Sequence, residues 1–225
     1  PVDFFGRKMI EKMPKEYRVG VINVSVAGAK IELWDKDAYK QYIDSERDWM
    51  KEIVKHYDGN PYKRLLDIAR LAQKAGVIKG ILVHQGESNS DDPEWPAKLA
   101  KIYLDLCKDL KLKTKDVPLL AGELKSKEQG GACYAFNEKI LPNLPKVLPN
   151  SYVISSLGCQ STGDQFHFNT EGMRLMGYRM AEKMLQLKGF TKPETRSVTL
   201  HAANKGIAIS PTLSGIFFED INQSL

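Results

Sequence analysis

The sequence predicts an α/β protein of three layers, in which a mostly parallel sheet lies between helices. Four short apolar segments alternate with longer segments whose apolar residues recur at helical spacing. Strands and helices that alternate in this way imply right-handed crossovers, which place helices on both faces of the sheet. Each predicted strand also leads into a polar loop, and α/β sheets carry their chemistry on the loops at the carboxyl ends of the strands.

The predicted strands are rich in β-branched and other apolar residues. They comprise residues 17–27, 77–83, 117–121 and 151–156. The first strand ends at Gly28, where a glycine permits a sharp turn. We expect all four strands to be buried in one sheet.

The predicted helices follow these strands. They comprise residues 37–56, a segment with Leu65, Leu66, Ala69 and Ala72 that ends at Gly76, a segment with Ala100, Tyr103, Leu104 and Cys107, residues 131–141, and residues 170–188. A stripe of apolar side chains runs along the last helix, namely Met173, Met176, Met180, Met184 and Leu187. We interpret this stripe as core packing, because flexible methionines fill irregular interior space.

The character of the chain changes after Gly189. Residues 189–195 read as a linker, and residues 198–202 and 206–209 look like two strands around a turn. The sequence therefore predicts a main domain over residues 1–188 and a short C-terminal β fragment over residues 196–225. We expect this fragment to be the truncated start of a second domain.

Composition excludes several classes of function. Apolar residues make up 42% and charged residues 27% of the 225 residues, as in globular proteins, and no apolar run is long enough to span a bilayer. The net charge of +5 comes from scattered lysines and arginines, so neither a nucleic-acid nor a membrane partner is expected. No signal peptide is visible. No cluster of His, Cys or Asp has ligand spacing, so we expect no metal and no cofactor.

Asp164 and His167 form the first candidate pair, on a loop that enters the last helix. A carboxylate can accept the imidazole Nδ1–H, fix its tautomer and stabilise the imidazolium that forms in catalysis. The spacing also fits a structural alternative, in which Asp164 caps the last helix or a turn and His167 packs at its start.

The second candidate loop is His84-Gln85-Gly86-Glu87. The Gln85 amide is a candidate donor to a developing oxyanion, and Glu87 is a candidate second carboxylate for His167. His84 is expected to be buried and hydrogen bonded. The alternative is a polar turn in which Glu87 pairs with a surface lysine. Gly28 is a candidate to offer a backbone N–H to the same oxyanion or, equally, to form a tight turn.

A hydrolase of this kind needs a nucleophile, and the sequence offers no convincing one. No serine or cysteine lies in a glycine-flanked turn directly after a strand. The candidates considered are Ser25, Ser88, Ser90, Cys159 and Ser161. Ser161 and Cys159 lie just before the Asp–His pair, but each fits a loop or core position better.

The string His-Gln-Gly-Glu-Ser at 84–88 and the string Asp-x-x-His-Phe at 164–168, together with residues 17–34, resemble the SGNH hydrolase superfamily. More narrowly, they are similar to carbohydrate esterase family six, the acetyl xylan esterases related to sialate O-acetylesterase. The resemblance covers most of residues 1–188 and implies a flavodoxin-like α/β fold without a cofactor.

The resemblance implies a role for each candidate. His167 is the general base, Asp164 is its orienting acid and Glu87 is a second acid. Gln85 and Gly28 match positions that help to form the oxyanion hole. The nucleophilic serine of the family stands in a Gly-Gln-Ser-Asn-like motif that this chain lacks. We therefore expect an esterase domain without its first strand and nucleophile, inactive alone.

Two departures from the family pattern concern the same loops. Ala27 stands where the family usually has the first of two glycines, and Asn169 stands where an acidic residue is common. The first departure bears on the oxyanion role of Gly28.

The tail carries a second resemblance. Residues 209–222 look like the start of an α-L-arabinofuranosidase of glycoside hydrolase family fifty-one. Both resemblances imply a secreted, multimodular hemicellulase that removes O-acetyl groups from xylan or a related acetylated polysaccharide, with a fused glycosidase domain. Two alternatives remain open. One is a sialate or small-ester O-acetylesterase, and the other is a non-catalytic carbohydrate-binding module that uses Trp34, Trp95 and Phe166.

Overall fold

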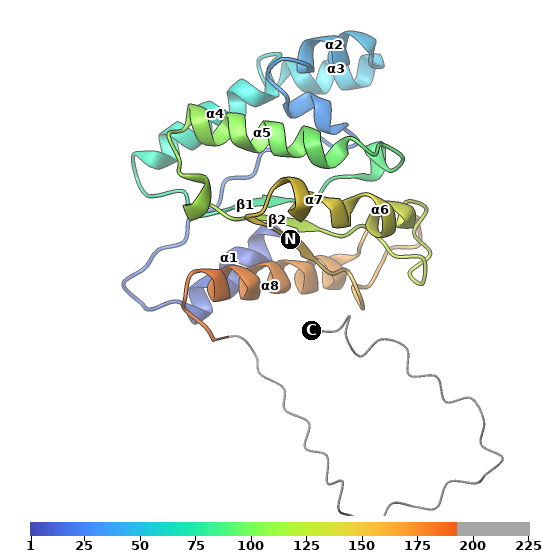
Figure 1. Cartoon of the computed structure of the whole chain (residues 1–225). Coiled ribbons are helices and arrows are strands. Elements are labelled where there is room, and N and C mark those ends of the chain that lie inside the picture. The colour runs from blue at the N-terminus through green and yellow to red at the C-terminus, as the bar shows by residue number, and fades with distance from the viewer. Residues whose placement is uncertain (193–225) are drawn as a thin grey trace, which may run out of the picture. The chain divides into compact units, whose positions relative to one another are not determined.

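The computed structural model describes residues 1–192, which form helices packed on both faces of a small sheet (Figure 1). The sheet is parallel and has the order β1 (Ile81–Val83), β2 (Leu119–Gly122) and β3 (Ser151–Ile154). Leu119 lies opposite Ile81 on one side and opposite Ser151 on the other. This arrangement confirms the predicted α/β class with its parallel sheet.

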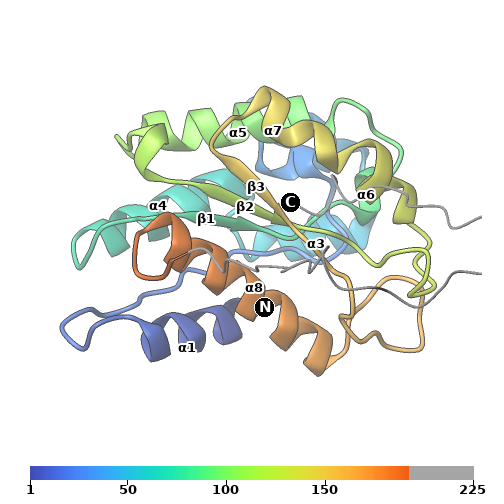
Figure 2. The same cartoon turned by 60° about the horizontal axis from the view of Figure 1, so that its bottom comes forward.

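Helices connect the strands and cover the sheet. They are α1 (Val2–Lys12), α2 (Tyr39–Ser45), α3 (Asp48–Lys55), α4 (Pro61–Gln73), α5 (Trp95–Asp109), α6 (Tyr134–Lys139), α7 (Leu144–Val147) and α8 (Thr170–Leu187). Four single turns of 3₁₀ helix lie between them, η1 (Ile31–Trp34), η2 (Glu87–Asn89), η3 (Thr114–Asp116) and η4 (Leu141–Asn143). Figure 2 shows α1 and α8 on one face of the sheet and α5 and α7 on the other. No helix in this part of the chain is both long and apolar enough to cross a membrane.

Successive residues of the central strand β2 face opposite sides of the sheet and pack into two different core clusters. Leu119 and Ala121 pack into the cluster made with α5, α6 and α7, whereas Leu120 packs against α1 and α8. All four residues of β2 are buried, because this strand has a neighbour on each side and helices on each face. The methionine stripe of α8 lies in this core as predicted, with Met176, Met180 and Met184 almost fully buried.

The first predicted strand is wrong in this structure. None of residues 17–27 belongs to a strand, although exposed and half-buried side chains alternate from Val21 to Val26. A β-strand needs hydrogen bonds from a neighbouring strand, and no described residue pairs with this segment. The β-branched composition therefore does not make a strand by itself.

Other element boundaries also differ from the sequence predictions. The helix expected over residues 37–56 is two helices, α2 and α3, separated at Glu46, whose backbone is extended. The strand expected over residues 77–83 shortens to β1, and Val77 is 72% exposed. The helix expected over residues 131–141 is reduced to α6 and the turn η4. Helix α1 has no counterpart among the predicted helices, whereas α8 matches its predicted range to within one residue.

The predicted tail over residues 196–225, with the family fifty-one resemblance, and residues 193–195 of the linker lie outside the described residues. The chain divides into a unit of residues 1–192 and a stretch of residues 193–225, and only the first is considered below.

Candidate active site

The loops that follow the three strands gather at one end of the sheet (Figures 1 and 2). Parallel strands end at the same edge, so residues after β1, β2 and β3 become neighbours. The contacts confirm this proximity. The thiol of Cys133 lies 3.7 Å from the carbonyl oxygen of Glu87, and the amide of Ala132 donates to the carbonyl of Gln165 at 3.1 Å. The candidate loops therefore form one region.

Asp164 and His167 are paired as the sequence predicts. Asp164 Oδ2 lies 2.7 Å from Nδ1 of His167, and Oδ1 accepts the backbone N–H groups of Phe166 and His167 at 2.8 and 2.7 Å. These donors favour the ionised carboxylate and hold the pKa of Asp164 well below its usual range. The pair is open to solvent, with 70% of the His167 side chain exposed.

One half of the capping alternative holds: Asp164 Oδ1 caps the turn of its own loop through the N–H groups of Phe166 and His167, but it does not cap the helix. The side chain that caps α8 is that of Asn169, which accepts the amide of Gly172 at 3.0 Å. Asp164 instead bonds the loop amides and the imidazole. Asn169 therefore caps the helix α8, and Asp164 orients the imidazole of His167.

The loop itself is closed by further hydrogen bonds. Thr162 donates both its backbone N–H and its hydroxyl to the carbonyl of His167, each at 3.0 Å, and Ser161 forms an isolated antiparallel bridge with Phe168. His167 Nδ1 is committed to Asp164, while Nε2 makes no hydrogen bond within residues 1–192. An imidazole with one nitrogen oriented by a carboxylate and the other open to solvent can act as a general base.

His84 lies beneath this loop as a hydrogen-bonded interior residue. Its Nε2 is 3.2 Å from the carbonyl oxygen of Glu123, and its ring stacks on Phe168 with centroids 5.9 Å apart. Burial lowers the pKa of His84, although the charge of Glu87 acts in the opposite direction. His84 therefore supports the loop as a neutral ring.

Gln85 has a different environment from the one expected for an oxyanion donor. Its amide nitrogen donates to the carbonyl of Ala29 at 3.1 Å and to Oδ1 of Asn89 at 2.9 Å, and its oxygen accepts the indole N–H of Trp95 at 2.6 Å. Both amide hydrogens are thus occupied, and neither points to a free ligand position. In this arrangement Gln85 joins the loops around the site instead of facing an oxyanion.

Asn89 is a site residue that the sequence analysis missed. It is 2% exposed, and its Oδ1 accepts both the Gln85 amide and the backbone N–H of Ile31 at 2.8 Å. Its amide nitrogen donates to Glu32 and Asp92 at 3.2 Å each. The available signal was its position directly after the His-Gln-Gly-Glu-Ser string, where a buried amide can fix the loop.

Gly28 keeps a backbone N–H that bonds to nothing within the described part of the chain. Its φ of +70° is in the left-handed region, and a Cβ at this position would lie 3.2 Å from the Trp49 ring. Its carbonyl accepts the Ser88 hydroxyl at 2.9 Å. The expected oxyanion donor and the expected tight turn are therefore both compatible with Gly28.

Glu87 is not hydrogen bonded to His167. Its carboxylate makes no ion pair or hydrogen bond with any residue in the 1–192 range, and the charge that it influences is that of His84. The structure thus gives Asp164, and not Glu87, as the acid that contacts the imidazole. The alternative pairing of Glu87 with a lysine is also not seen.

None of the nucleophile candidates hydrogen bonds to His167 through its side chain within residues 1–192. Ser88 donates to Gly28, as noted above, and the carbonyl of Ser25 accepts the hydroxyl of Tyr57 at 2.6 Å. Cys159 is 3% exposed, and burial raises the pKa of its thiol, which disfavours the reactive thiolate. No other serine or cysteine of the described residues hydrogen bonds to Nε2 of His167.

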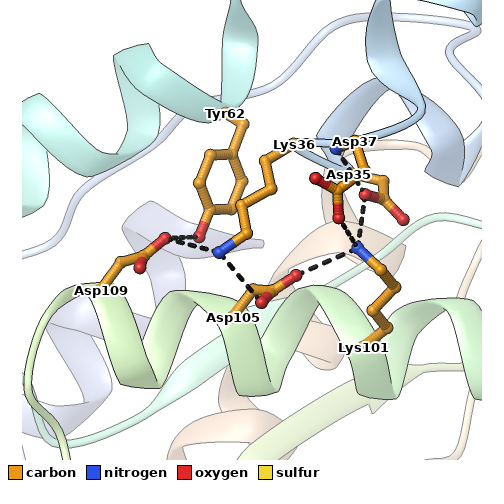
Figure 3. Close-up of polar contacts among 7 residues, drawn as sticks. All are labelled: Asp35, Lys36, Asp37, Tyr62, Lys101, Asp105 and Asp109. Atoms are coloured by element: carbon orange, nitrogen blue, oxygen red, sulfur yellow. Dashed lines mark hydrogen bonds and ion pairs between the residues drawn. The ribbon is translucent and has the colours of Figure 1, made fainter.

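One group of carboxylates outside this region is close enough to bind a cation. Oxygens of Asp35, Asp37 and Asp105 lie within 4.8 Å of one another. The ammonium of Lys101 already lies among them, at 2.7, 2.7 and 3.1 Å respectively (Figure 3). Burial alone would lower the pKa of Lys101, but the hydrogen bonds to the three carboxylates together outweigh it, so that the pKa is raised and the ammonium stays charged. The group is therefore a salt-bridge network that ties α5 to residues 35–37.

The same network continues along α5. Lys36 bridges Asp105 and Asp109 at 3.0 and 3.1 Å, and the hydroxyl of Tyr62 donates to Asp109 at 2.7 Å.

A separate hollow of about 390 Å³ lies between α1 and residues 19–23, and none of the predicted site residues lines it. This hollow is therefore separate from the candidate active site.

Two comparisons with known proteins bear on this site. The sequence profile of a family described as carbohydrate esterase, sialic acid-specific acetylesterase, matches residues 1–186. A protein from Arabidopsis thaliana, solved by X-ray crystallography, has a similar structure with a TM-score of 0.62 at 20% sequence identity. The match covers 81% of this chain and 66% of the Arabidopsis protein, so the chain spans slightly less than two thirds of that relative. At this identity the likeness shows the fold alone.

Proposed function

Because the chain belongs to the carbohydrate esterase family of sialic acid-specific acetylesterases, we propose that it carries the general base of a serine-dependent carbohydrate O-acetylesterase. The observation that carries this proposal is the pair of His167 and Asp164, with Nδ1 held by the carboxylate and Nε2 open to solvent. In acyl transfer this is the arrangement that activates a hydroxyl.

In the proposed reaction, Nε2 of His167 takes the proton of the serine hydroxyl while the oxygen attacks the acetyl carbonyl. The carboxylate of Asp164 stabilises the imidazolium, and the free N–H of Gly28 faces the oxyanion. Collapse of the tetrahedral intermediate breaks the bond to the sugar oxygen, which takes the proton from Nε2. Water, activated by the same nitrogen, then cleaves the acetyl-serine and releases acetate.

The nucleophile in this proposal lies outside residues 1–192. The support is that the described serines and cysteines are engaged elsewhere or do not contact His167, and that the Gly-Gln-Ser-Asn-like motif is absent from the chain. We expect residues 1–225 alone to show no turnover of p-nitrophenyl acetate that a serine-directed phosphonate blocks. Phosphonate-sensitive turnover by this chain would contradict the assignment.

The catalytic role of His167 is tested by supplying the nucleophilic serine that the proposal requires. We expect esterase activity when a segment of the parent protein that carries the serine motif is joined to residues 1–225. His167→Ala then lowers kcat by at least about 10³-fold. His56→Ala is the matched control, because His56 is an exposed histidine at the end of α3, and it should leave kcat unchanged. Equal rates in the two variants would sink the general-base role.

The substrate is proposed as O-acetylated xylan or a related plant polysaccharide. The sequence resemblance to acetyl xylan esterases and the arabinofuranosidase-like tail support xylan, whereas the family description names sialic acid. We measure kcat/KM of the joined enzyme on acetylated xylan and on O-acetylated sialic acid. A higher kcat/KM on O-acetylated sialic acid than on acetylated xylan would contradict the xylan proposal and favour a sialate O-acetylesterase.

A non-catalytic carbohydrate-binding module remains the second candidate, with less support. Trp95 was expected to stack on sugar rings, but it is 0% exposed and its indole N–H is bonded to Gln85, so this expectation is wrong. Trp34 packs against the core. Phe166 is 42% exposed beside His167, and it is the member of the trio that is free to stack. Xylo-oligosaccharide binding that Phe166→Ala abolishes and His167→Ala does not change would favour this candidate.

We also propose that the parent protein is secreted and carries a glycosidase domain after residue 195. The support is the resemblance of residues 209–222 to family fifty-one enzymes and the extracellular location of plant polysaccharide. Release of arabinose from xylan by culture medium of cells that express the parent would test both points together. Activity confined to cell lysate would contradict secretion.

A further inference from the structure

Lys125 is a buried lysine beside the candidate active site, just after β2. It is 2% exposed and is the one lysine of residues 1–192 that is fully buried. Its ammonium donates to the backbone carbonyl of Asp164 and forms no ion pair with a carboxylate in the described chain. Lysines are almost never buried without a charged partner, because an ammonium loses its hydration there. Its burial therefore indicates a specific task.

The loop that begins at Lys125 also makes a hydrogen bond to Gln165, the residue that follows Asp164. The amide of Ala132, at the other end of residues 125–132, donates to the carbonyl of Gln165 at 3.1 Å. We call residues 125–132 the clamp loop. Two successive carbonyls of the loop that carries Asp164 and His167 are thus bonded by the two ends of the clamp loop.

The clamp loop is itself well anchored. Gly131 donates its amide to the carbonyl of Ser126 at 2.9 Å, and a Cβ on Gly131 would lie only 2.2 Å from the Lys125 carbonyl oxygen. The side chain of Gln129 donates to the carbonyls of Ser156 and Cys159 at 2.8 Å each. A loop fixed in this way can position what it contacts.

These bonds determine where the Asp164 carboxylate lies. The carbonyl of Asp164 is held by the buried ammonium of Lys125, and its carboxylate accepts the N–H groups of Phe166 and His167. Without the ammonium, the peptide unit after Asp164 can rotate, and the carboxylate moves with it. The imidazole then loses the acceptor that orients Nδ1.

We propose that Lys125 is a positioning residue that fixes the backbone of Asp164 and thereby the orientation of His167, an inference that deepens the proposed esterase function and rests on it. Lys125 does not contact the reacting atoms in this proposal. It acts through the carbonyl of Asp164, and its charge strengthens that bond beyond what a neutral donor gives.

The test uses the whole chain, residues 1–225, and needs no activity. Lys125→Met removes the ammonium and keeps the apolar stem. We measure hydrogen exchange of the Phe166 and His167 amides and the NMR resonance of the His167 Nδ1–H. We expect exchange of both amides to rise about tenfold or more, as for loss of a charged hydrogen bond, and the Nδ1–H resonance to vanish through exchange with water. Lys125→Arg, which keeps a cationic donor, should restore both signals in part.

The controls separate positioning from general stability. Lys127→Met removes a lysine of the same clamp loop that is exposed and lies over the Tyr134 ring, and it should change neither signal. The Leu120 amide in β2 should keep its protection in Lys125→Met. Unchanged loop signals in Lys125→Met would overturn the proposal. Equal loss of protection at Leu120 would also overturn it, as would failure of both Lys125→Met and Lys125→Arg to fold. Either result would show that Lys125 supports the stability of the whole domain and does not specifically position Asp164. An inactive joined enzyme would refute the esterase proposal and leave this result intact.

Discussion

At the scale of single residues, Asp164 determines what the imidazole of His167 can do. Three N–H groups converge on one exposed carboxylate, two from the backbone and one from the imidazole. The donors are close in sequence, so the loop preforms the acceptor before any substrate binds. This is the preorganisation that general-base catalysis uses.

The pH dependence of this pair follows from the lowered pKa of Asp164. The ordinary value is 3.8, and the folded value lies below it because the hydrogen bond from His167 and the two backbone donors favour the ionised form. The stabilising contribution is therefore complete above pH 3.8 and is lost as the pH falls through the lower folded pKa. We expect NMR titration of the Asp164 carboxyl carbon to find its midpoint below 3.8, and His167→Ala to raise that midpoint. A midpoint at 3.8 or above in the native protein would show that the pair does not form in solution.

The residues of this site differ in how far sequence reveals them. Asp164 and His167 are three residues apart, and local spacing predicts their contact. Lys125 and Asn89 were not predicted, because their roles depend on burial, and lysine and asparagine are usually exposed. Gln85 was predicted to belong to the site, but its partner at Ala29 is 56 residues away in the sequence, so its role needed the structure.

At the scale of elements, the amide of Gln85 joins three segments around the end of β1. It links the carbonyl of Ala29 before η1, the side chain of Asn89 in η2 and the indole of Trp95 at the start of α5. Trp95 in turn packs edge-on against Phe136 of α6, with ring centroids 4.9 Å apart. The side chain of Gln85 thus connects the loop that contains Gly28 to the loop that contains Glu87.

Replacement of this amide by a carboxylate tests the linking role. In Gln85→Glu, the carbonyl of Ala29 and Oδ1 of Asn89 face a second acceptor in place of a donor. We expect a loss of about 3 kcal/mol in the free energy of unfolding, measured by urea denaturation. Gln41→Glu on the exposed face of α2 should cost less than about 0.5 kcal/mol. A Gln85→Glu protein of native stability would contradict the linking role of Gln85.

The predicted elements succeeded where the signal was local and failed where it was not. The 3.6-residue periodicity of α8 and its cap at Asn169 determine that helix from its own sequence. Residues 18–26 have strand composition but no strand beside them among the described residues, so their pattern has nothing to pair with. The break between α2 and α3 has no glycine or proline to announce it.

At the scale of the whole described unit, the buried sheet and the candidate site differ in the packing that supports them. The sheet lies between two clusters of buried side chains, whereas the site lies on loops at one end. Function on loops held by a rigid scaffold is the usual solution in α/β proteins. The charged network of α5 and the clamp loop are two ways in which those outer segments are fixed to the scaffold.

This difference predicts a steep gradient of hydrogen exchange across the unit. The amides of Leu119 and Glu123 donate to Asn150 and Ile154 inside the sheet, at 3.0 and 2.9 Å, and should exchange only through global unfolding. No amide of residues 18–26 donates a hydrogen bond within the described chain. We expect protection in β2 to exceed that of residues 18–26 by at least about 10³-fold, because a stable domain unfolds rarely and an unpaired segment exchanges from its native state. Slow exchange at Val19 and Val21 would contradict this, and dependence of that protection on protein concentration would show that a second copy supplies the strand partner.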